Sequence, residues 1–475
     1  MATRPMIKPA SPTDLSRRGL GGKALRRTGP LILALAAVGL SACATYHARP
    51  LPDHPALATT PTELKVTTAQ LRVTPLKAIR IDPSDGLSPT EVAVLAVLND
   101  PDLAARRAAY KVSDAQVFVA GLLPDPQVSA SVDKPVAGPD THTAYSASIA
   151  MDLSALLART YARRAAKFSA KEADLNLLWA EWGVAQQART LAETALADET
   201  RAAWLRKVLA LAADRSARSE RALQRRDVAT QTTAADLAVK LDAQTQLATA
   251  EHDAQKARRD LNGLLNLEAG VMLPLVNGPP ASAYGEAELR SALASLPDRR
   301  PDLLALKAGY GAQDVNLRKA ILAQFPLSNL AIAFASDTAG AVTRGLSAGF
   351  GLPVFNGGRG DVRIQDATRE QLRAEFQARL DQADAEVKDA QRELESAQRQ
   401  AVSLRADVPR LEALVQPAVA AYDRGDIDSQ TYLTLSQNAL SRRADLDDRE
   451  LAARVAEIVL ETALFLPPAD ARAPQ

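Results

Sequence analysis

The chain has 475 residues, a formal net charge of +1, 47% hydrophobic residues and only 4% aromatic residues. A near-neutral charge offers no concentrated basic face, so the composition argues against a nucleic-acid partner. The four scattered histidines share no helical spacing, and the sequence contains no catalytic triad pattern or glycine-rich phosphate loop; we therefore expect no metal site, no cofactor and no enzyme. These histidines are His47, His54, His142 and His252.

Residues 1–42 have the layout of a bacterial export signal. Basic residues, including Arg17 and Arg18, precede an apolar run from Leu31 to Leu40 that is too short to span a bilayer comfortably. The run leads into Leu-Ser-Ala-Cys, which resembles the bacterial lipobox and ends at the only cysteine, Cys43. In that class Cys43 is lipidated and becomes the first mature residue, and Ala44 after it implies delivery to the outer membrane. The alternatives are an ordinary signal peptide or a short membrane anchor, and the export route, Sec or twin-arginine, stays open.

The next part of the chain predicts an irregular segment followed by a helix, a hairpin and two more helices. Residues 43–87 are rich in proline and predict an extended segment on the protein surface. Ser88 and Pro89 predict the start of a helix that reaches about residue 122, with a break near residues 99–101. Alternating apolar and polar residues predict a two-faced β-hairpin, and two helices with a turn between them should follow. The expected strands are 127–133 and 144–151, the expected helices are 153–223 and 230–267, and the expected turn is Arg225-Arg226-Asp227.

The second half of the chain repeats the first. Pro101-Asp102-Leu103 recurs as Pro301-Asp302-Leu303, and residues 223–231 align with residues 422–430 around a second turn. Such ordered matches indicate an internal duplication. We expect structural repeats at 88–280 and 281–466 and a C-terminal tail at 467–475. The second repeat should hold strands at 329–334 and 346–352 and helices at 358–420 and 429–464.

The helix expected over 358–420 carries two series of apolar residues, each with a seven-residue spacing. At 1.5 Å per residue, about 60 residues span roughly 90 Å, so this helix needs partners of equal length. The two shorter helices of a repeat would together form such a partner if they stack end to end. Pro409 inside the long helix should bend or loosen it. The two series are Leu380, Val387, Leu394, Ala401 and Val408, and Phe376, Ala383, Ala390, Ala397, Leu404 and Leu411.

The two-faced hairpins are the main indication of function. Open strand edges would leave backbone groups unsatisfied in hydrocarbon, and one chain has too few strands for an aqueous barrel. We therefore expect several chains to close one barrel together, with Val, Ile, Leu and Phe facing lipid and Ser, Asn and Gly facing the lumen. The alternative is a pair of soluble hairpins that cap a coiled coil.

These features together resemble the TolC-like outer-membrane factors, in their lipoprotein branch. The resemblance covers about residues 88–465 and rests on the duplicated halves and four short motifs. It implies a mainly α fold with a membrane β-barrel contribution, in which long coiled-coil helices and β-hairpins from a homotrimer form an α/β-barrel channel-tunnel. The motifs are Arg300-Pro301-Asp302-Leu303, Ala323-Gln-Phe-Pro326, Leu352-Pro-Val-Phe-Asn-Gly-Gly358 and Tyr422-x-x-Gly425.

In that family the channel is the passive exit duct of a tripartite efflux or type I secretion system. The resemblance thus implies an outer-membrane location reaching into the periplasm, with lipid, a periplasmic adaptor and an inner-membrane pump as partners. A periplasmic adaptor or a structural coiled-coil lipoprotein is the rival interpretation. The transported substrate is not indicated.

The two turns would form the periplasmic tip of the tunnel. Asp423, Asp426 and Asp428 cluster there, and three copies would give a carboxylate ring that favours cations. A solvated acidic turn fits equally well. At the family's gating positions this chain has Thr431 and Thr434. We therefore expect Asp426 and Asp428 to constrict the opening, with Arg225 and Arg226 as closing partners. Asp227 and Gly425 complete the expected tip residues.

Overall fold

The computed structural model describes residues 46–68, 71–77, 79–82, 85–325, 327–351 and 353–468. Cys43, the expected export signal at 1–42 and residues 469–475 lie outside the described residues. The chain divides into two units, residues 1–55 and 56–475. In the first unit, residues 46–55 are exposed and have no regular secondary structure. None of the described helices is both long and apolar enough to cross a lipid bilayer. All the described helices and strands lie in the second unit.

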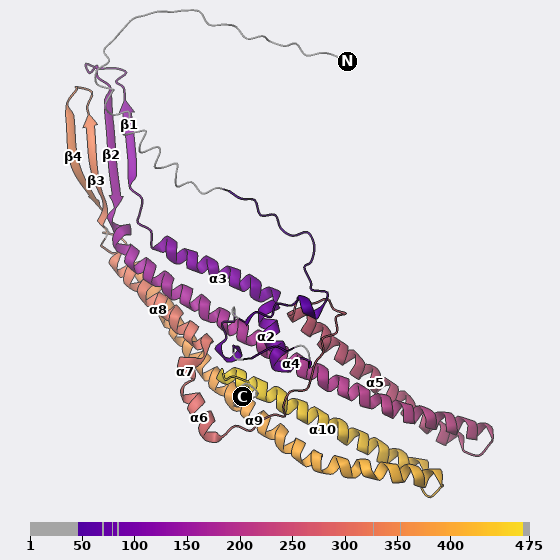
Figure 1. The fold of residues 1–475 in the computed structure, drawn as a ribbon. Helices are drawn as coiled ribbons and strands as arrows, with labels where there is room; N and C mark the ends of the chain where they lie inside the picture. The colour runs from indigo at the N-terminus through magenta and orange to yellow at the C-terminus, as the bar shows by residue number, and fades with distance from the viewer. Residues whose placement is uncertain are drawn as a thin grey trace, which may run out of the picture. The chain divides into compact units, whose positions relative to one another are not determined.

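The first repeat has the elements that the sequence predicts (Figure 1). Its first helix begins with a capping box, because Ser88 Oγ accepts from the Glu91 N–H and the Glu91 carboxylate accepts from the Ser88 N–H. The break at residues 99–101 follows from Pro101, and Asp100 caps the next helix by accepting from the Leu103 N–H at 2.6 Å. The elements are α2 (Pro89–Asn99), α3 (Pro101–Ala120), β1 (Gln127–Asp133), β2 (Ala144–Asp152), α4 (Leu153–Gln224) and α5 (Thr230–Leu264).

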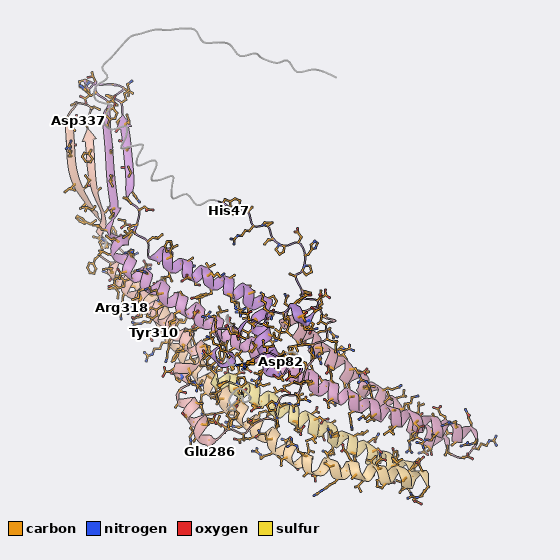
Figure 2. The ribbon with its side chains drawn as sticks, in the orientation of Figure 1. His47, Asp82, Glu286, Tyr310, Arg318 and Asp337 are labelled. Carbon is orange, nitrogen blue, oxygen red and sulfur yellow. The ribbon has the colours of Figure 1, made fainter. Side chains whose placement is uncertain are left out.

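The second repeat has the same order, with two short helices that the sequence did not predict, α6 and α7. Strand β4 begins four residues earlier than expected, at Val342. The reason is a tight turn: Asp337 accepts hydrogen bonds from the Ala339 and Ala341 N–H groups, and Gly340 has a φ of 92°. Figure 2 labels Asp337 at the end of the sheet away from the helices. The elements are α6 (Glu286–Ala294), α7 (Leu296–Arg299), α8 (Pro301–Leu322), β3 (Leu327–Ser336), β4 (Val342–Phe350), α9 (Arg359–Asp423) and α10 (Ser429–Leu464).

The two hairpins join into one antiparallel sheet in the order β1-β2-β3-β4. Val128, Ile149, Ile332 and Leu346 are cross-strand neighbours on one face, and all four are at least half exposed. The other face carries small and polar residues, and Ser129 and Ser148 share a hydrogen bond of 2.8 Å there. The predicted two-faced sheet is confirmed, and its apolar face is uncovered in the single chain. Among the described strands, β1 and β4 each pair along one edge only.

Two shorter helices pack along the length of each long helix. Arg107 of α3 contacts Glu181 of α4, whereas Arg258 of α5 contacts Glu199 farther along α4. In the second repeat, α8 lies beside the first part of α9 and α10 beside the rest. This arrangement agrees with the predicted end-to-end stacking: α3 and α8, of 20 and 22 residues, lie beside one part of a long helix, and α5 and α10, of 35 and 36 residues, lie beside the other. Seven of the eight buried residues of α9 belong to the two predicted series, and the eighth, Ala418, lies seven residues after Leu411. The helix runs without interruption through Pro409 and Pro417.

The segment expected to lie on the surface contributes to the core. It holds two short 3₁₀ helices, η1 (Pro61–Glu63) and η3 (Thr74–Leu76). Leu71, Val73 and Leu76 are at most 2% exposed and pack with Leu103 and Trp182. The expectation of a surface segment is therefore wrong for this part. The apolar side chains of α2 and α4 leave a surface there that the segment covers, and such burial is favourable.

The repeated Pro-Asp-Leu motif of the second half forms a buried ion-pair network. Arg300 is fully buried and donates to Asp302 and to Glu386 of α9, while Arg379 donates to the same two carboxylates. Burial opposes ionisation of Glu386, but hydrogen bonds from Arg379 and Arg300 outweigh this and lower its pKa. Arg300 also donates to the Ala463 carbonyl near the end of α10. The motif therefore ties α8, α9 and α10 together.

Candidate functional site

The two turns between the long helices and their partners are built in the same way. In the first, the Arg226 N–H donates to the Leu223 carbonyl and the Asp227 N–H to the Ala222 carbonyl. In the second, Gly425 and Asp426 donate to Tyr422 and Ala421 in the same pattern. These are Schellman motifs, which satisfy the last carbonyls of a helix and need a left-handed residue. The predicted duplication thus extends to single hydrogen bonds at both turns.

Gly425 occupies the left-handed position of the second turn with a φ of 82°, and Arg226 occupies it in the first with a φ of 64°. A residue with a Cβ atom is strained in this region by about 1–2 kcal/mol. The Arg226 side chain forms no ion pair with any described residue. Arg226 is therefore a strained, exposed cation at the end of the helices.

The other expected tip residues pair locally within the chain. Arg225 contacts Asp227 at 3.0 Å, and Arg424 contacts Asp426 at 2.8 Å, so the two turns carry equivalent ion pairs. Asp423 lies 3.6 Å from Arg218 of α4. The expected pairing of Arg225 and Arg226 with Asp426 and Asp428 is not present within the described chain.

Asp428 has a role that the sequence analysis did not assign. Its carboxylate caps α10 by accepting from the Thr431 N–H at 2.7 Å. The hydrogen bonds from the Thr431 backbone and side chain lower the pKa of Asp428. Thr434, the second family gating position, donates its hydroxyl to the Gln430 carbonyl of its own helix. Of the three clustered aspartates, Asp428 is thus already engaged in holding the start of a helix.

A cluster missed by the sequence analysis joins all four helices near the turns. Arg215 of α4 donates to Asp236 of α5 at 2.7 Å, and their side chains are 9% and 0% exposed. The same guanidinium lies over the rings of Tyr422 and Tyr432, 3.9 and 4.4 Å from their centroids. These two rings stack with centroids 5.6 Å apart. Arg215 therefore connects the α4–α5 hairpin with the α9–α10 hairpin.

A signal for part of this cluster was present in the sequence. Arg215 and Asp236 lie at nearly equal distances from the Arg225–Asp227 turn, so a helical hairpin places them opposite each other. The cation–π contacts depend on how the two hairpins pack against each other, which no local pattern records. A cavity of about 240 Å³ lies between the same four helices, and its lining includes Trp204, Leu211 and Leu440.

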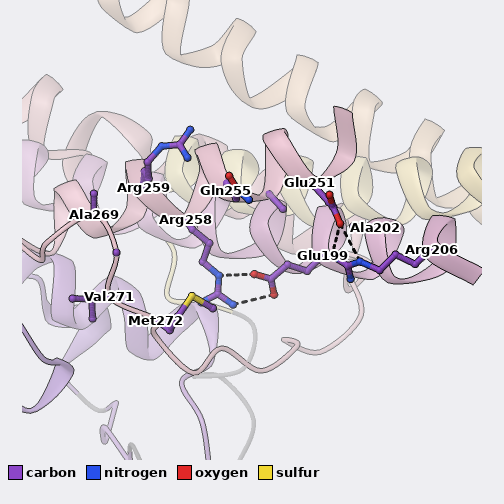
Figure 3. Close-up of a pocket in the computed structure, with 12 residues that line it drawn as sticks. Glu199, Ala202, Arg206, Glu251, Gln255, Arg258, Arg259, Ala269, Val271 and Met272 are labelled. Carbon is purple, nitrogen blue, oxygen red and sulfur yellow. Dashed lines mark hydrogen bonds and ion pairs between the residues drawn. The ribbon is translucent and has the colours of Figure 1, made fainter. Parts of the chain in front are cut away.

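Another cavity, of about 540 Å³, lies between α4, α5 and the segment after α5 (Figure 3). Four of its five charged side chains are paired with one another: Arg258 binds both carboxylate oxygens of Glu199, and Arg206 binds Glu251 at 2.7 Å. The paired side chains clamp α5 to α4. Among the described residues, no group of three or more His, Cys, Asp or Glu side chains is placed to hold a metal ion.

The arrangement of helices and sheet can be compared with known proteins. No protein-family model matches the chain, and no curated protein matches its sequence. Solved structures match its fold. The structure of CusC has a TM-score of 0.68 at 17% identity, covering 87% of this chain and 98% of that chain. The outer-membrane channel OprN has a TM-score of 0.68 at 15% identity, covering 89% and 99%. The CmeC outer membrane channel of Campylobacter jejuni has a TM-score of 0.67 at 16% identity, covering 88% and 94%.

The chain therefore has the TolC-like channel-tunnel fold, and the predicted resemblance is confirmed at the level of the fold. It is mainly helical with one small antiparallel sheet, as expected. OprN and CmeC, which share this fold, are outer-membrane channels.

Proposed function

We propose that this chain is one subunit of a homotrimeric outer-membrane channel that serves as the passive exit duct of a tripartite efflux or type I secretion system. The carrying observation is the four-stranded sheet, whose apolar face is exposed and whose β1 and β4 have open edges in one chain. Three copies joined through these edges close a barrel and satisfy the backbone groups that lipid cannot. The likeness to outer-membrane channels supports the same assembly.

The two faces of the sheet fit this assembly. The apolar residues face lipid, and the serines, alanines and glycines of the other face line a water-filled lumen. The helices continue the conduit into the periplasm, and the two turns form its inner end. Cys43 carries the lipid anchor that holds the start of the mature chain at the outer membrane. A periplasmic adaptor and an inner-membrane pump supply the rest of the path and the energy.

The turn end is the proposed gate. Opening requires the α4–α5 and α9–α10 hairpins of a subunit, or of neighbouring subunits, to separate. The Arg215 cluster and the pair Arg218–Asp423 hold the two hairpins of one chain together. Three copies of Asp423 and Asp426 would set the charge of the opening. The MtrE channel of Neisseria gonorrhoeae, which shares the fold with a TM-score of 0.61, has been solved in an open state, which supports a gate that moves.

The decisive test is conductance of the purified mature chain in planar lipid bilayers, together with its mass in detergent. We expect a trimer that resists dissociation by SDS until it is heated, and discrete current steps in bilayers. An adaptor or a structural coiled-coil lipoprotein would give neither. A water-soluble monomer without ion current would overturn the proposal.

The lipid anchor is tested separately. Cys43→Ser should abolish labelling of the chain by radioactive palmitate in cells and block processing at Cys43. Since the barrel would still insert, the trimer should persist. Unchanged labelling would contradict the assignment of Cys43.

A further inference from the structure

We propose that the concave face near the sheet holds a luminal binding site for amphipathic organic anions, which names a substrate class for the channel and rests on the function proposed above. The site is a cavity of about 840 Å³ at the junction between the helices and the sheet. A volume of this size accommodates a drug-sized molecule. Neither the duplicated sequence nor the turn region indicated it.

The cavity lies on the concave side of a layer of four helices. Within the second unit α3 packs against α4, α4 against α8, and α8 against α9. The cavity is nevertheless lined by residues from all four helices. Four helices packed in series can line one cavity only if their layer curves around it. In the proposed trimer the copies join at the two ends of this layer, so its concave face is directed toward the central axis.

One wall of the cavity is apolar. It consists of the end of α3 and the residues that follow, where Val119, Leu122 and Leu123 are 64%, 52% and 62% exposed. Alanines of α4 and α8 extend this wall, among them Ala158 and Ala320. Exposed apolar side chains of this size, gathered in a hollow, favour the apolar body of a ligand.

The rest of the lining is polar and carries a net positive charge. Arg159 of α4 and Lys319 of α8 supply two cations, and Asp361 of α9 supplies the one carboxylate. Arg159 is held in place because its Nε donates to the Gly121 carbonyl at 2.8 Å. Arg163, one turn farther on, also reaches Gly121. Neither Lys319 nor Asp361 forms an ion pair with a described residue. The pair Arg159 and Lys319 therefore suits a sulfonate, carboxylate or phosphate group beside the apolar wall.

Binding of a matched pair of probes to the purified mature chain tests this site. Naphthalene-2-sulfonate and 2-naphthylmethylammonium have the same apolar body and opposite charge. We expect the sulfonate to bind at least ~10-fold more tightly than the ammonium in equilibrium dialysis, since two cations face one carboxylate. The double variant Arg159→Gln/Lys319→Gln should lose this preference, and Asp361→Asn should tighten sulfonate binding.

The control removes the same charge from the same helices without touching the cavity. Arg164→Gln/Arg318→Gln changes residues of α4 and α8 that do not line the cavity. Arg318, which Figure 2 labels, is paired with Asp314. This control should bind the sulfonate as the parent chain does. Arg159 also holds the end of α3, so its replacement could disturb the fold. The single variant Lys319→Gln avoids this, because the Lys319 side chain has no structural partner, and it should weaken sulfonate binding ~3-fold or more.

Equal affinity for the two probes would contradict the proposed site. An equal loss of sulfonate affinity in the cavity variant and in the control would also contradict it. Conductance separates this result from the function proposed above. Sulfonate binding without any ion current would support the binding site and contradict the channel function. An ion current that the sulfonate reduces in the parent but not in the cavity variant would support both the channel function and the binding site. An ion current without sulfonate binding would contradict the binding site alone.

Discussion

At the scale of single residues, the two turns differ in one position that matters physically. Gly425 adopts its left-handed conformation without steric cost, whereas Arg226 has the same conformation with a side chain attached. Strain of this kind persists where the surrounding structure imposes it, and it gathers at functional sites. The Schellman hydrogen bonds on both sides of Arg226 impose it here.

Replacing the strained residue tests this view. Arg226→Gly should stabilise the α4–α5 turn by about 1 kcal/mol, because glycine removes the strain but adds freedom to the unfolded chain. Hydrogen exchange of the amides at the end of α4 would measure it. The matched change Gly425→Arg should destabilise the other turn. A loss of protection in Arg226→Gly would contradict the strain and indicate that the arginine side chain stabilises the turn.

The buried pair Arg215–Asp236 should dominate the stability of the turn end. Removing one partner leaves a buried charge uncompensated, so Arg215→Gln should cost about 3–5 kcal/mol. In the double variant Arg215→Gln/Asp236→Asn the loss should be smaller than in Arg215→Gln alone. The exposed Arg218→Gln serves as a control and should cost less than about 1 kcal/mol. Urea denaturation of the parent and the three variants would measure these differences, and equal costs for Arg215→Gln and Arg218→Gln would refute the assignment.

The sequence located the candidate tip but not its chemistry. The repeated turn motif identified Arg225, Arg226, Asp227 and Gly425 correctly as turn residues, since turn geometry is a local property. The capping role of Asp428 was also local and could have been deduced from the Asp-x-x-Thr spacing. The contacts of Arg215 with Tyr422 and Tyr432 join helices from different repeats. Such contacts depend on packing that one sequence does not record.

At the scale of elements, the periodicity of apolar residues predicted the long helices and the strands but missed the short helices and the irregular segment. Helix α9 follows its seven-residue pattern because its whole length packs against α8 and α10. The short helices α6 and α7 have too few turns to show a period. The burial of Leu71, Val73 and Leu76 was missed because a proline-rich segment is typical of exposed chain, and only the assembled helices create the apolar surface that it covers.

The contact between α4 and α5 should depend on pH. Burial, with the nearby charges of Asp253 and Asp448, raises the pKa of Asp198, although Arg201 opposes this. A carboxyl whose pKa is raised in the folded state binds protons more readily there than in the unfolded chain. Stability therefore falls as pH rises from the ordinary pKa of an aspartate, near 3.8, through the folded value.

The variant Asp198→Asn should consequently raise the melting temperature at pH 7, well above the ordinary pKa of aspartate. The gain should vanish at about pH 2.5, more than one unit below the ordinary pKa of aspartate, where the carboxyl of the parent is mostly protonated in both states. Scanning calorimetry at the two pH values measures it, with the exposed Asp242→Asn of α5 as the control. A gain of equal size at both pH values would show that removal of charge is not its cause.

At the scale of the whole assembly, the sheet decides between a conduit and a rod with soluble hairpins. Ile149 and Ser148 are adjacent in β2 but lie on opposite faces, and in the single chain Ile149 is exposed and Ser148 is partly exposed. Ile149 belongs to the apolar row with Val128, Ile332 and Leu346, and Ser148 is bonded to Ser129. A sheet surrounded by water would accept an arginine at either position with similar consequences.

A barrel in lipid would treat the two positions differently. Ile149→Arg should cost about 2–4 kcal/mol, because a cation on the lipid face near the bilayer midplane cannot be solvated there. We expect fewer heat-modifiable trimers of this variant in outer-membrane fractions. Ser148→Arg should assemble normally, since a luminal side chain remains in water, and should shift the reversal potential of the channel toward anions. Normal assembly of Ile149→Arg, with an unchanged reversal potential in Ser148→Arg, would place both faces in water and refute the barrel.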